Sequence, residues 1–258
     1  MQFGIFDHVD ADGQPLQQLF ETRLKVVETY DRLGFRSYHP AEHHFTPLGI
    51  GASPSVWLSA VAQRTRRLRF GPLIYALPFT HPIRLAEEIA MLDHLSGGRL
   101  EMGFGRGASP IELAYVGLDA AAADQSFREG LAVVLAALTN DRLTYRGERF
   151  RFDDVPIHLR PLQQPHPPLW YGLHSLDSAE RVARQGWNVV VNEKPSASGK
   201  LLARYRDVWR DEKNHARQRS GNPERTYTAL NHESPEFIRF VNPGDFRVAH
   251  ISCGTSGC

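Results

Sequence analysis

The fold is decided by residues 77–107, LPFTHPIRLAEEIAMLDHLSGGRLEMGFGRG. The middle of this stretch predicts a helix from His81-Pro82 onward, because four apolar residues recur at helical spacing: Leu85, Ile89, Leu92 and Leu95. Gly97-Gly98 predicts the end of that helix, since glycine readily takes the left-handed conformation found past helix ends. The apolar run at 99–107 then predicts a strand and its exit turn. A helix followed at once by a strand is typical of α/β folds.

The same alternation extends in both directions. Strands are predicted at 2–6, 35–40, 68–77, 99–107, 168–173 and 187–192. Helices are predicted at 15–33, 53–65, 81–95, 124–138, 175–185 and 198–216, the second opening with Ser53 as N-cap and Pro54 in the first turn. Six βα units in order predict an α/β fold of the TIM (β/α)8-barrel type, with an open flavodoxin-like sheet as the alternative. Residues 143–152, LTYRGERFRF, predict a hairpin insertion.

The pattern fails after residue 226. Residues 226–230, TYTAL, could supply a short seventh strand, but no seventh helix, eighth strand or eighth helix is predicted. We therefore expect an incomplete barrel domain at 1–226, followed by an atypical tail at 227–258 that is disordered, truncated or frameshifted. Cys253 and Cys258 both lie in this tail, so they cannot cross-link the body of the fold and lack the companions that a zinc site needs.

The composition excludes several classes of protein. Hydrophobic residues make up 41% and charged residues 23%, which is ordinary for a globular domain, and the net charge of +1 gives no reason to expect nucleic acid or an anionic membrane as partner. Neither a signal peptide nor an apolar run of about 20 residues is present, which predicts a cytoplasmic protein. The basic run RTRRLRF at 64–70 is interpreted as helix capping and surface charge.

Three segments with unusual residues follow predicted strands, where the loops of a barrel build its active site. PAEHHFTPLG at 40–49 contains His43 and His44, which we expect to face opposite ways because side chains alternate along extended backbone. A metal site is therefore not expected there. GFGRGASP at 103–110 offers glycines for close approach and Arg106 for an anion. GLHSLDSAER at 172–181 places Ser175 and Ser178 at a helix start, which suits phosphate as well as simple capping.

Three blocks carry a family resemblance. AEHHFTPLG, the stretch 77–107 quoted above and LWYGLHSLDSAERVARQG resemble, in this order, the bacterial luciferase-like flavin-dependent monooxygenases. The likeness runs from Met1 to about residue 221. It implies a TIM-type barrel, a homodimer or heterodimer, and reduced FMN delivered by a separate flavin reductase. Such proteins react the flavin with O2 to form a C4a-hydroperoxyflavin, which oxygenates a small organic substrate such as an aldehyde or ketone.

The resemblance also assigns residues. His43 matches the catalytic histidine beside the flavin, Arg106 matches the arginine on the FMN phosphate, and Ser175 and Ser178 match hydroxyl contacts to that phosphate. The Leu73-Ile74 bond aligns with a non-proline cis peptide at the flavin face.

Two positions depart from bacterial luciferase. Gly105 replaces a reactive cysteine, and His174 replaces an acidic residue near the phosphate.

Two alternatives stay open. One is an F420-dependent oxidoreductase that transfers hydride without oxygen chemistry. The other is a non-catalytic or truncated luciferase-like subunit, whose sheet would leave two strand edges unpaired.

Overall fold

The computed structural model describes residues 3–107, 109–191, 195–220, 239–241 and 247–250. Helices and strands alternate along this part of the chain, and the six predicted βα units are present in order. The strands are β1 (Phe3–Asp7), β2 (Ser37–Pro40), β3 (Arg69–Phe70), β4 (Tyr75–Ala76), β5 (Met102–Gly105), β6 (Arg142–Arg146), β7 (Arg151–Pro156), β8 (Leu169–Gly172), β9 (Asn188–Val191), β10 (Arg239–Val241) and β11 (Arg247–His250). The helices are α1 (Leu16–Leu33), α2 (Pro54–Arg64), the 3-10 turn η1 (Leu77–Phe79), α3 (Pro82–Ser96), α4 (Pro110–Tyr115), α5 (Ala120–Thr139), α6 (Leu176–Gln185) and α7 (Pro195–Ser220). None of the described helices is both long and apolar enough to cross a bilayer.

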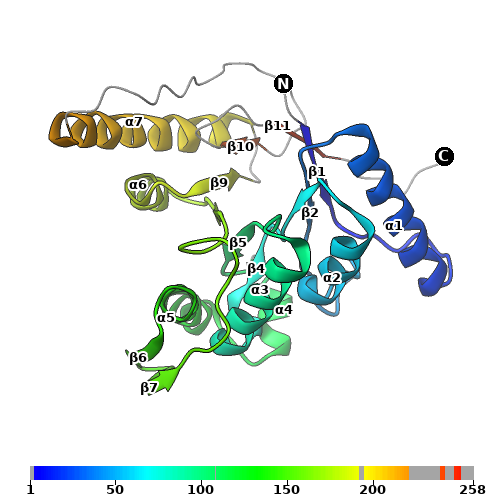
Figure 1. Cartoon of the computed structure of the whole chain (residues 1–258), viewed down its shortest axis with the longest axis horizontal. Helices are drawn as coiled ribbons and strands as arrows, with labels where there is room; N and C mark the ends of the chain where they lie inside the picture. Colours follow the sequence, from blue (N-terminus) through cyan, green and yellow to red (C-terminus); the bar gives the residue numbers. More distant parts are fainter. Residues whose placement is uncertain (1–2, 108, 192–194, 221–238, 242–246, 251–258) are drawn as a thin grey trace.

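The strands form a curved wall in sequence order (Figure 1). One sheet has the order β11-β1-β2-β3 and the other β10-β9-β8-β5-β4, and a parallel bridge between Phe70 and Leu100 links the two. The order therefore progresses in one direction, without the reversal that a flavodoxin-like sheet shows, so that alternative is wrong. The predicted barrel-type α/β architecture is confirmed. No ladder joins β10 to β11 among the described strands, so the wall is not a closed ring.

The predicted third strand, 68–77, is in fact two short strands. β3 and β4 are separated by residues 71–74, and residues 77–79 form the turn η1 instead of continuing the strand. Pro72 has no N–H to donate to a ladder, which favours the interruption. Gly71 lies so close to the next strand that a Cβ there would be 1.8 Å from the carbonyl oxygen of Glu101. The peptide bond between Leu73 and Ile74 is cis, as the resemblance predicts.

Successive residues of the strands point to opposite faces of the wall and belong to two separate apolar clusters. Ile5, Tyr171 and Val189 belong to the large cluster that also contains the buried helix residues. A second cluster contains no helix residue and faces away from the helices: Phe6, Ala41, Leu73, Trp170 and Val190. This smaller cluster therefore lies on the face of the wall opposite the large cluster.

The helix ends mostly follow the sequence signals. Gly34 and Gly97 end α1 and α3 in the left-handed conformation, with φ of 81° and 65°. Ser53 precedes α2 as predicted, although its side chain makes no capping hydrogen bond. The predicted stripe of α3 is wrong at Leu95, which is 49% exposed. The buried face turns instead toward Ala86 and Ala90, small residues that allow α3 to approach its neighbours closely.

The predicted hairpin is confirmed as a two-stranded sheet of its own. β6 and β7 pair antiparallel with each other and with no other described strand. Glu129 of α5 holds the tip, because its carboxylate accepts hydrogen bonds from the backbone N–H groups of Glu148, Arg149 and Phe150. The hairpin therefore lies beside α5 at one end of the molecule (Figure 1).

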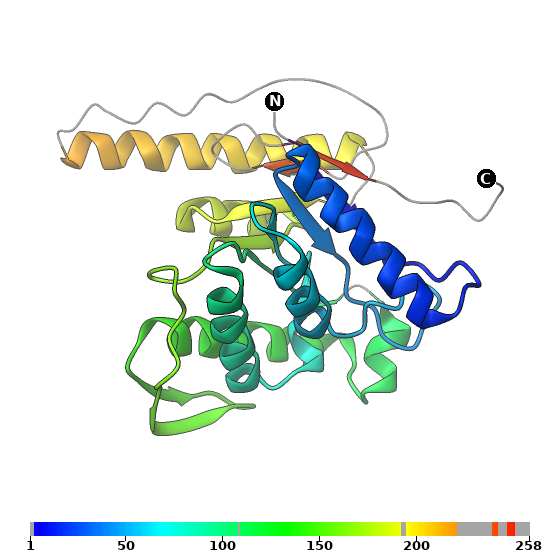
Figure 2. The same ribbon diagram turned by 45° about the vertical axis from the view of Figure 1, so that its right-hand side comes forward.

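The tail is less irregular than the sequence predicts. β11 pairs in parallel with β1, and β10 pairs antiparallel with β9 (Figure 2). The tail therefore adds two strands that the sequence did not predict, but no ladder joins β10 to β11, so each keeps an unpaired edge in the described part of the chain. Both strands have only three or four residues, which is too few for an alternating pattern to be recognised. The seventh-strand candidate at 226–230 and both cysteines lie outside the described residues.

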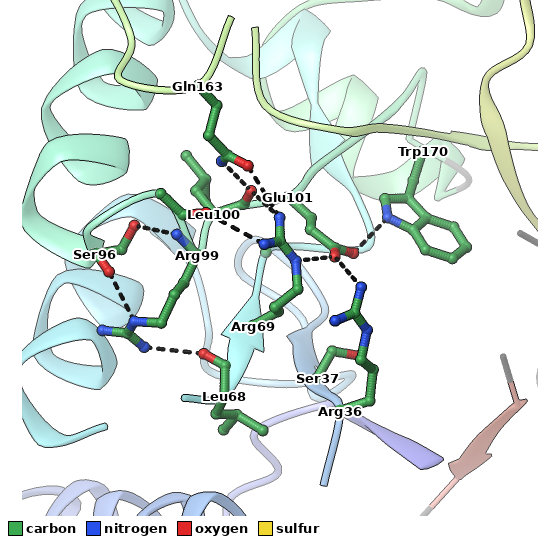
Figure 3. Close-up of polar contacts among 12 residues, drawn as sticks. Arg36, Ser37, Leu68, Arg69, Ser96, Arg99, Leu100, Glu101, Gln163 and Trp170 are labelled. Atoms are coloured by element: carbon green, nitrogen blue, oxygen red, sulfur yellow. Dashed lines mark hydrogen bonds and ion pairs between the residues drawn. The ribbon is translucent and has the colours of Figure 1, made fainter. Parts of the chain in front are cut away.

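A buried polar cluster, which we call the basal network, lies where the strands begin (Figure 3). The carboxylate of Glu101 accepts from Arg69 Nε at 2.5 Å and from the Trp170 indole at 2.8 Å, and Arg36 lies 4.0 Å away. Arg99 donates to the carbonyls of Ala62 and Leu68. The interpretation of run 64–70 as surface charge holds for Arg64 but is wrong for Arg69, whose side chain is only 18% exposed.

Candidate functional site

The candidate site lies at the opposite end of the wall, where the parallel strands finish. The loops after β2, β5 and β8 meet there, because β5 pairs in parallel with both β4 and β8. Phe104 is the register partner of Tyr171, so Arg106 and His174 follow neighbouring strand ends. The three segments predicted from sequence are therefore brought to one edge, as expected for parallel strands.

His43 forms a pair with Glu112 of α4. Nδ1 of His43 lies 3.1 Å from Oε1 of Glu112, and Thr46 donates its hydroxyl to the same oxygen at 3.0 Å. The His8 ring, just after β1, stacks on His43 with centroids 5.7 Å apart and an interplanar angle of 14°. The Glu112 side chain is 6% exposed and that of His43 22%. His43 is thus half-buried and oriented by two residues that the sequence prediction missed.

A sequence signal for Glu112 did exist. Ser109-Pro110 opens α4, and the Ser109 hydroxyl accepts the Glu112 N–H at 3.3 Å, so Glu112 has the position of a capping-box glutamate. Its side chain contacts the loop after β2. That loop is 66 to 69 residues earlier in the chain, and no local pattern could have identified the partner.

His44 belongs to a second pair that faces away from His43. Its Nε2 lies 2.8 Å from Glu42 Oε1, and its ring stacks on Phe79 at 4.5 Å. The other oxygen of Glu42 accepts the Ala76 N–H at 3.1 Å. Burial raises the pKa of Glu42, and the hydrogen bond that His44 donates to Glu42 raises the pKa of His44. The predicted divergence of the two histidines is confirmed, and the described residues contain no group of three metal-ligating side chains suited to an ion.

The predicted flavin-face residues Leu73, Ile74 and Gly105 lie together. A Cβ at Gly105 would be 2.8 Å from Cδ1 and Cγ1 of Ile74. A Cβ at Gly103 would be 2.3 Å from the carbonyl oxygen of Pro72 and 2.7 Å from Cδ2 of Leu73. Two glycines on β5 therefore make room for the segment that carries the cis bond.

Two arginines, Arg106 and Arg181, lie near Tyr171 at the end of β8. Arg106 is exposed and forms no hydrogen bond or ion pair with the described part of the chain. Arg181 donates to the Tyr171 hydroxyl at 2.8 Å, and its guanidinium lies 5.6 Å from the centre of that ring. Burial raises the pKa of Tyr171, while the charges of Arg181 and Arg106 lower it. Arg181 was not predicted, although its position one turn after Ser178 on α6 could have indicated it.

Ser175 and Ser178 form a capping box. Ser175 Oγ accepts the Ser178 N–H, and Ser178 Oγ accepts the Ser175 N–H while donating to the Ser175 carbonyl at 2.8 Å. Ser178 is thereby fully accounted for by capping, whereas Ser175 is exposed at the helix end next to the exposed His174. Phosphate contacts by Ser175, Ser178 and His174 stay predictions.

Comparison with known proteins places these features in a family context. The family model for luciferase-like monooxygenases matches residues 1–229. Uncharacterized protein y4wF of Sinorhizobium fredii is 47% identical over 212 residues, which cover 82% of this chain and 61% of that protein. The oxygenase component of the flavin-dependent trigonelline monooxygenase of Acinetobacter baylyi is 33% identical over 195 residues, which cover 74% of this chain and 54% of that protein.

A solved structure is similar as well. The crystal structure of monooxygenase RslO1 from Streptomyces bottropensis superimposes with a TM-score of 0.76 at 31% identity, covering 86% of this chain and 75% of that one. The chain spans between half and two thirds of the length of the two curated relatives.

Proposed function

The chain belongs to the luciferase-like monooxygenase family, and from that premise we propose that it is the oxygenase component of a flavin-dependent monooxygenase. It uses reduced FMN and O2 to oxygenate a small organic substrate such as an aldehyde or ketone. The observation that carries this proposal is that an oriented histidine, His43, and an exposed arginine, Arg106, lie at the same end of the wall.

The residues present fit a flavin phosphate. Arg106 has no anionic partner in the described chain, and the first turn of α6 presents N–H groups beyond the one that its cap satisfies. Arg181 adds a second positive charge near Tyr171. These groups would hold the phosphate by charge-assisted hydrogen bonds. The segment Leu73-Ile74, which packs into the space left by Gly103 and Gly105, would support the flat apolar ring.

His43 is proposed as the general acid/base. Its ring is fixed by Glu112 on one nitrogen and by His8 on one face, which leaves the other nitrogen for a ligand. Reduced FMN, when bound, would supply the electrons that activate O2. The protein itself would orient the flavin, exclude water from it and move one proton at His43.

Binding of FMN tests the phosphate site. The Arg106→Ala variant is expected to weaken anaerobic binding of reduced FMN by about 10- to 100-fold, because a hydrogen bond to a charged group is worth roughly 1.5–3 kcal/mol. Riboflavin, which lacks the phosphate, should bind both proteins equally. Arg84→Ala is the matched control, since Arg84 is 72% exposed on α3 and only 4.0 Å from Glu88. Equal FMN affinity of wild type and Arg106→Ala would contradict the site.

Turnover tests the role of His43. With a flavin reductase, NADH, FMN and a panel of aldehydes and ketones, the protein should form oxygenated product, and His43→Ala should lower kcat by about 100-fold or more. Reduced-FMN affinity should change little. Product formation that is undiminished in His43→Ala would refute the assignment.

The two alternatives are separated by simple measurements. An F420-dependent enzyme would bind F420 more tightly than FMN in fluorescence quenching and would show hydride transfer without O2 consumption. A non-catalytic subunit would bind neither cofactor, although it would still melt cooperatively.

Two partners are proposed. A separate reductase is supported by the name of the trigonelline relative, which is called an oxygenase component. A homodimer or heterodimer is supported by exposed apolar side chains on the adjacent helices α2 and α3: Val56 at 73%, Met91 at 54% and Leu95 at 49%. Light scattering of wild type and Val56→Asp should give a dimer and a weakened dimer, respectively.

A further inference from the structure

We propose that Glu112 is a positioning residue that fixes His43 as the tautomer protonated on Nδ1 and so makes Nε2 the nitrogen that acts on the ligand. Only the predicted effect of Glu112 on turnover rests on the proposed function. The tautomer itself concerns the side chains of this chain alone.

The first step concerns the direction of the hydrogen bond. Thr46 donates to Glu112 Oε1 at 3.0 Å, so that oxygen is an acceptor, and His43 Nδ1 lies 3.1 Å from the same atom. An ionised carboxylate can only accept, and therefore Nδ1 carries the proton. In water a histidine side chain favours the tautomer protonated on Nε2, which means that Glu112 reverses the intrinsic preference.

The second step concerns how the ring is held. His8 stacks on one face of His43, and Gly49 borders its edge, where a Cβ would be 3.7 Å from His43 Cδ2. No described residue hydrogen-bonds to Nε2. The ring is thus contacted on one face, on one edge and at Nδ1, and Nε2 is the ring nitrogen without a hydrogen bond to the described residues.

The third step concerns how Glu112 is held. Ser109 caps its N–H at 3.3 Å, and Tyr115 packs edge-on against Phe45 at 6.1 Å, which joins α4 to the loop after β2 a second time. The Glu112 side chain is 6% exposed, so an unpaired carboxylate there would be costly. When His43 takes a proton at Nε2, the resulting imidazolium lies against this carboxylate and is stabilised by it. The only change is one proton gained at Nε2 and one lost by the ligand.

Nitrogen-15 NMR of the flavin-free protein tests the tautomer directly. Neutral His43, assigned by the signal that disappears in His43→Gln, should be protonated on Nδ1 in wild type and on Nε2 in Glu112→Ala. Thr46→Val removes a donor but keeps the carboxylate, and should retain the Nδ1 tautomer. Finding the Nε2 tautomer in wild type, or the same tautomer in wild type and Glu112→Ala, would overturn the proposal.

Two further measurements guard against ambiguity. If Glu112→Ala fails to fold, Glu112→Gln serves instead, because its amide N–H2 can donate to Nδ1 and should produce the Nε2 tautomer. In turnover assays, Glu112→Ala should lower kcat by about 10- to 100-fold, because losing the residue that orients an active-site histidine typically has an effect of this size. The affinity for FMN should stay within about twofold of that of wild type. Glu112→Asp should restore part of kcat. If no FMN-dependent turnover exists, the NMR result still decides the tautomer, so the two proposals fail separately.

Discussion

The two ends of the strand wall use the same residue types for different purposes. At the start of the strands, Arg69 and Trp170 saturate the buried carboxylate of Glu101, and Arg99 donates to several carbonyls. At the finish of the strands, Arg106 has no partner in the described chain, and large apolar side chains are exposed, among them Phe45 at 80% and Ile111 at 59%. Polar groups whose hydrogen bonds are satisfied within the protein contribute to its stability, whereas polar groups without a partner in the protein are available to bind ligands.

The largest effect should come from breaking the basal network. Glu101→Ala removes the buried acceptor of Arg69 Nε and of the Trp170 indole, which is expected to cost about 3–5 kcal/mol in the free energy of unfolding. Urea unfolding followed by circular dichroism measures this. Glu88→Ala is the control, because Glu88 has only a 4.0 Å contact on the surface, and it should change stability by less than about 0.5 kcal/mol. A loss below about 1 kcal/mol for Glu101→Ala would show that the network is dispensable.

The next effect distinguishes the two glycines of β5. Gly103→Ala places a Cβ 2.3 Å from a backbone oxygen that cannot move freely, and about 1–3 kcal/mol or more of destabilisation is expected. Gly105→Ala meets Cδ1 and Cγ1 of the Ile74 side chain at 2.8 Å and no backbone atom, so it should cost less. Parallel urea curves compare the two, and a more severe loss for Gly105→Ala would contradict this packing.

At the end of the wall where the strands finish, we expect a smaller effect on stability and a specific effect on FMN binding. Arg106→Ala should leave the free energy of unfolding within about 0.5 kcal/mol of wild type, since nothing in the described chain depends on that side chain. Combined with weaker FMN binding, this result is the inverse of the one expected for Glu101→Ala. Strong destabilisation by Arg106→Ala would mean that the contrast between the two ends is false.

The smallest effect concerns pH. Burial works to raise the pKa of Asp31, but its hydrogen bonds from the backbone N–H groups of Arg66, Arg67 and Leu68 outweigh it, and the net pKa is lowered from 3.8. A lowered folded-state pKa contributes stability above the unfolded value, which is lost as pH falls through the folded value. Asp31→Asn should therefore lose stability at pH 7 and lose little more between pH 4 and pH 2. Identical acid sensitivity of Asp31→Asn and wild type would refute the assignment.

Much of the fold could be predicted because its signals are local. Helical spacing, helix-ending glycines and short apolar runs each occupy a few consecutive residues, and they located α1, α3, β5 and the hairpin. The split of the third strand was missed because Gly71 depends on the carbonyl of Glu101, 30 residues later. The strands β10 and β11 were missed because each is too short to show alternation.

The site divides in the same way. His43 and Arg106 follow strands directly, so their placement could be predicted from the order of elements. Glu112 and His8 contact His43 from segments far apart in the chain, so no local pattern links them to it, whereas Arg181 lies only ten residues from its partner Tyr171. The orientation of His43 depends on Glu112 and His8, which is why its position at a strand end could be predicted but its hydrogen-bonded orientation could not.

The separate pairing of β6 and β7 has a consequence for how such a protein diversifies. Since the hairpin shares no ladder with the wall, its strands can be lengthened, shortened or replaced without moving the register of any neighbouring strand. It is attached to the body by the Glu129 carboxylate at the tip, where a Cβ on Gly147 would lie 2.1 Å from an oxygen of that group, and by apolar side chains that pack against the core, Leu143 and Phe152 among them. Grafts that keep Glu129, Gly147 and the apolar side chains that pack against the core should therefore be tolerated, which makes this segment the natural place to introduce an epitope tag or a new recognition loop.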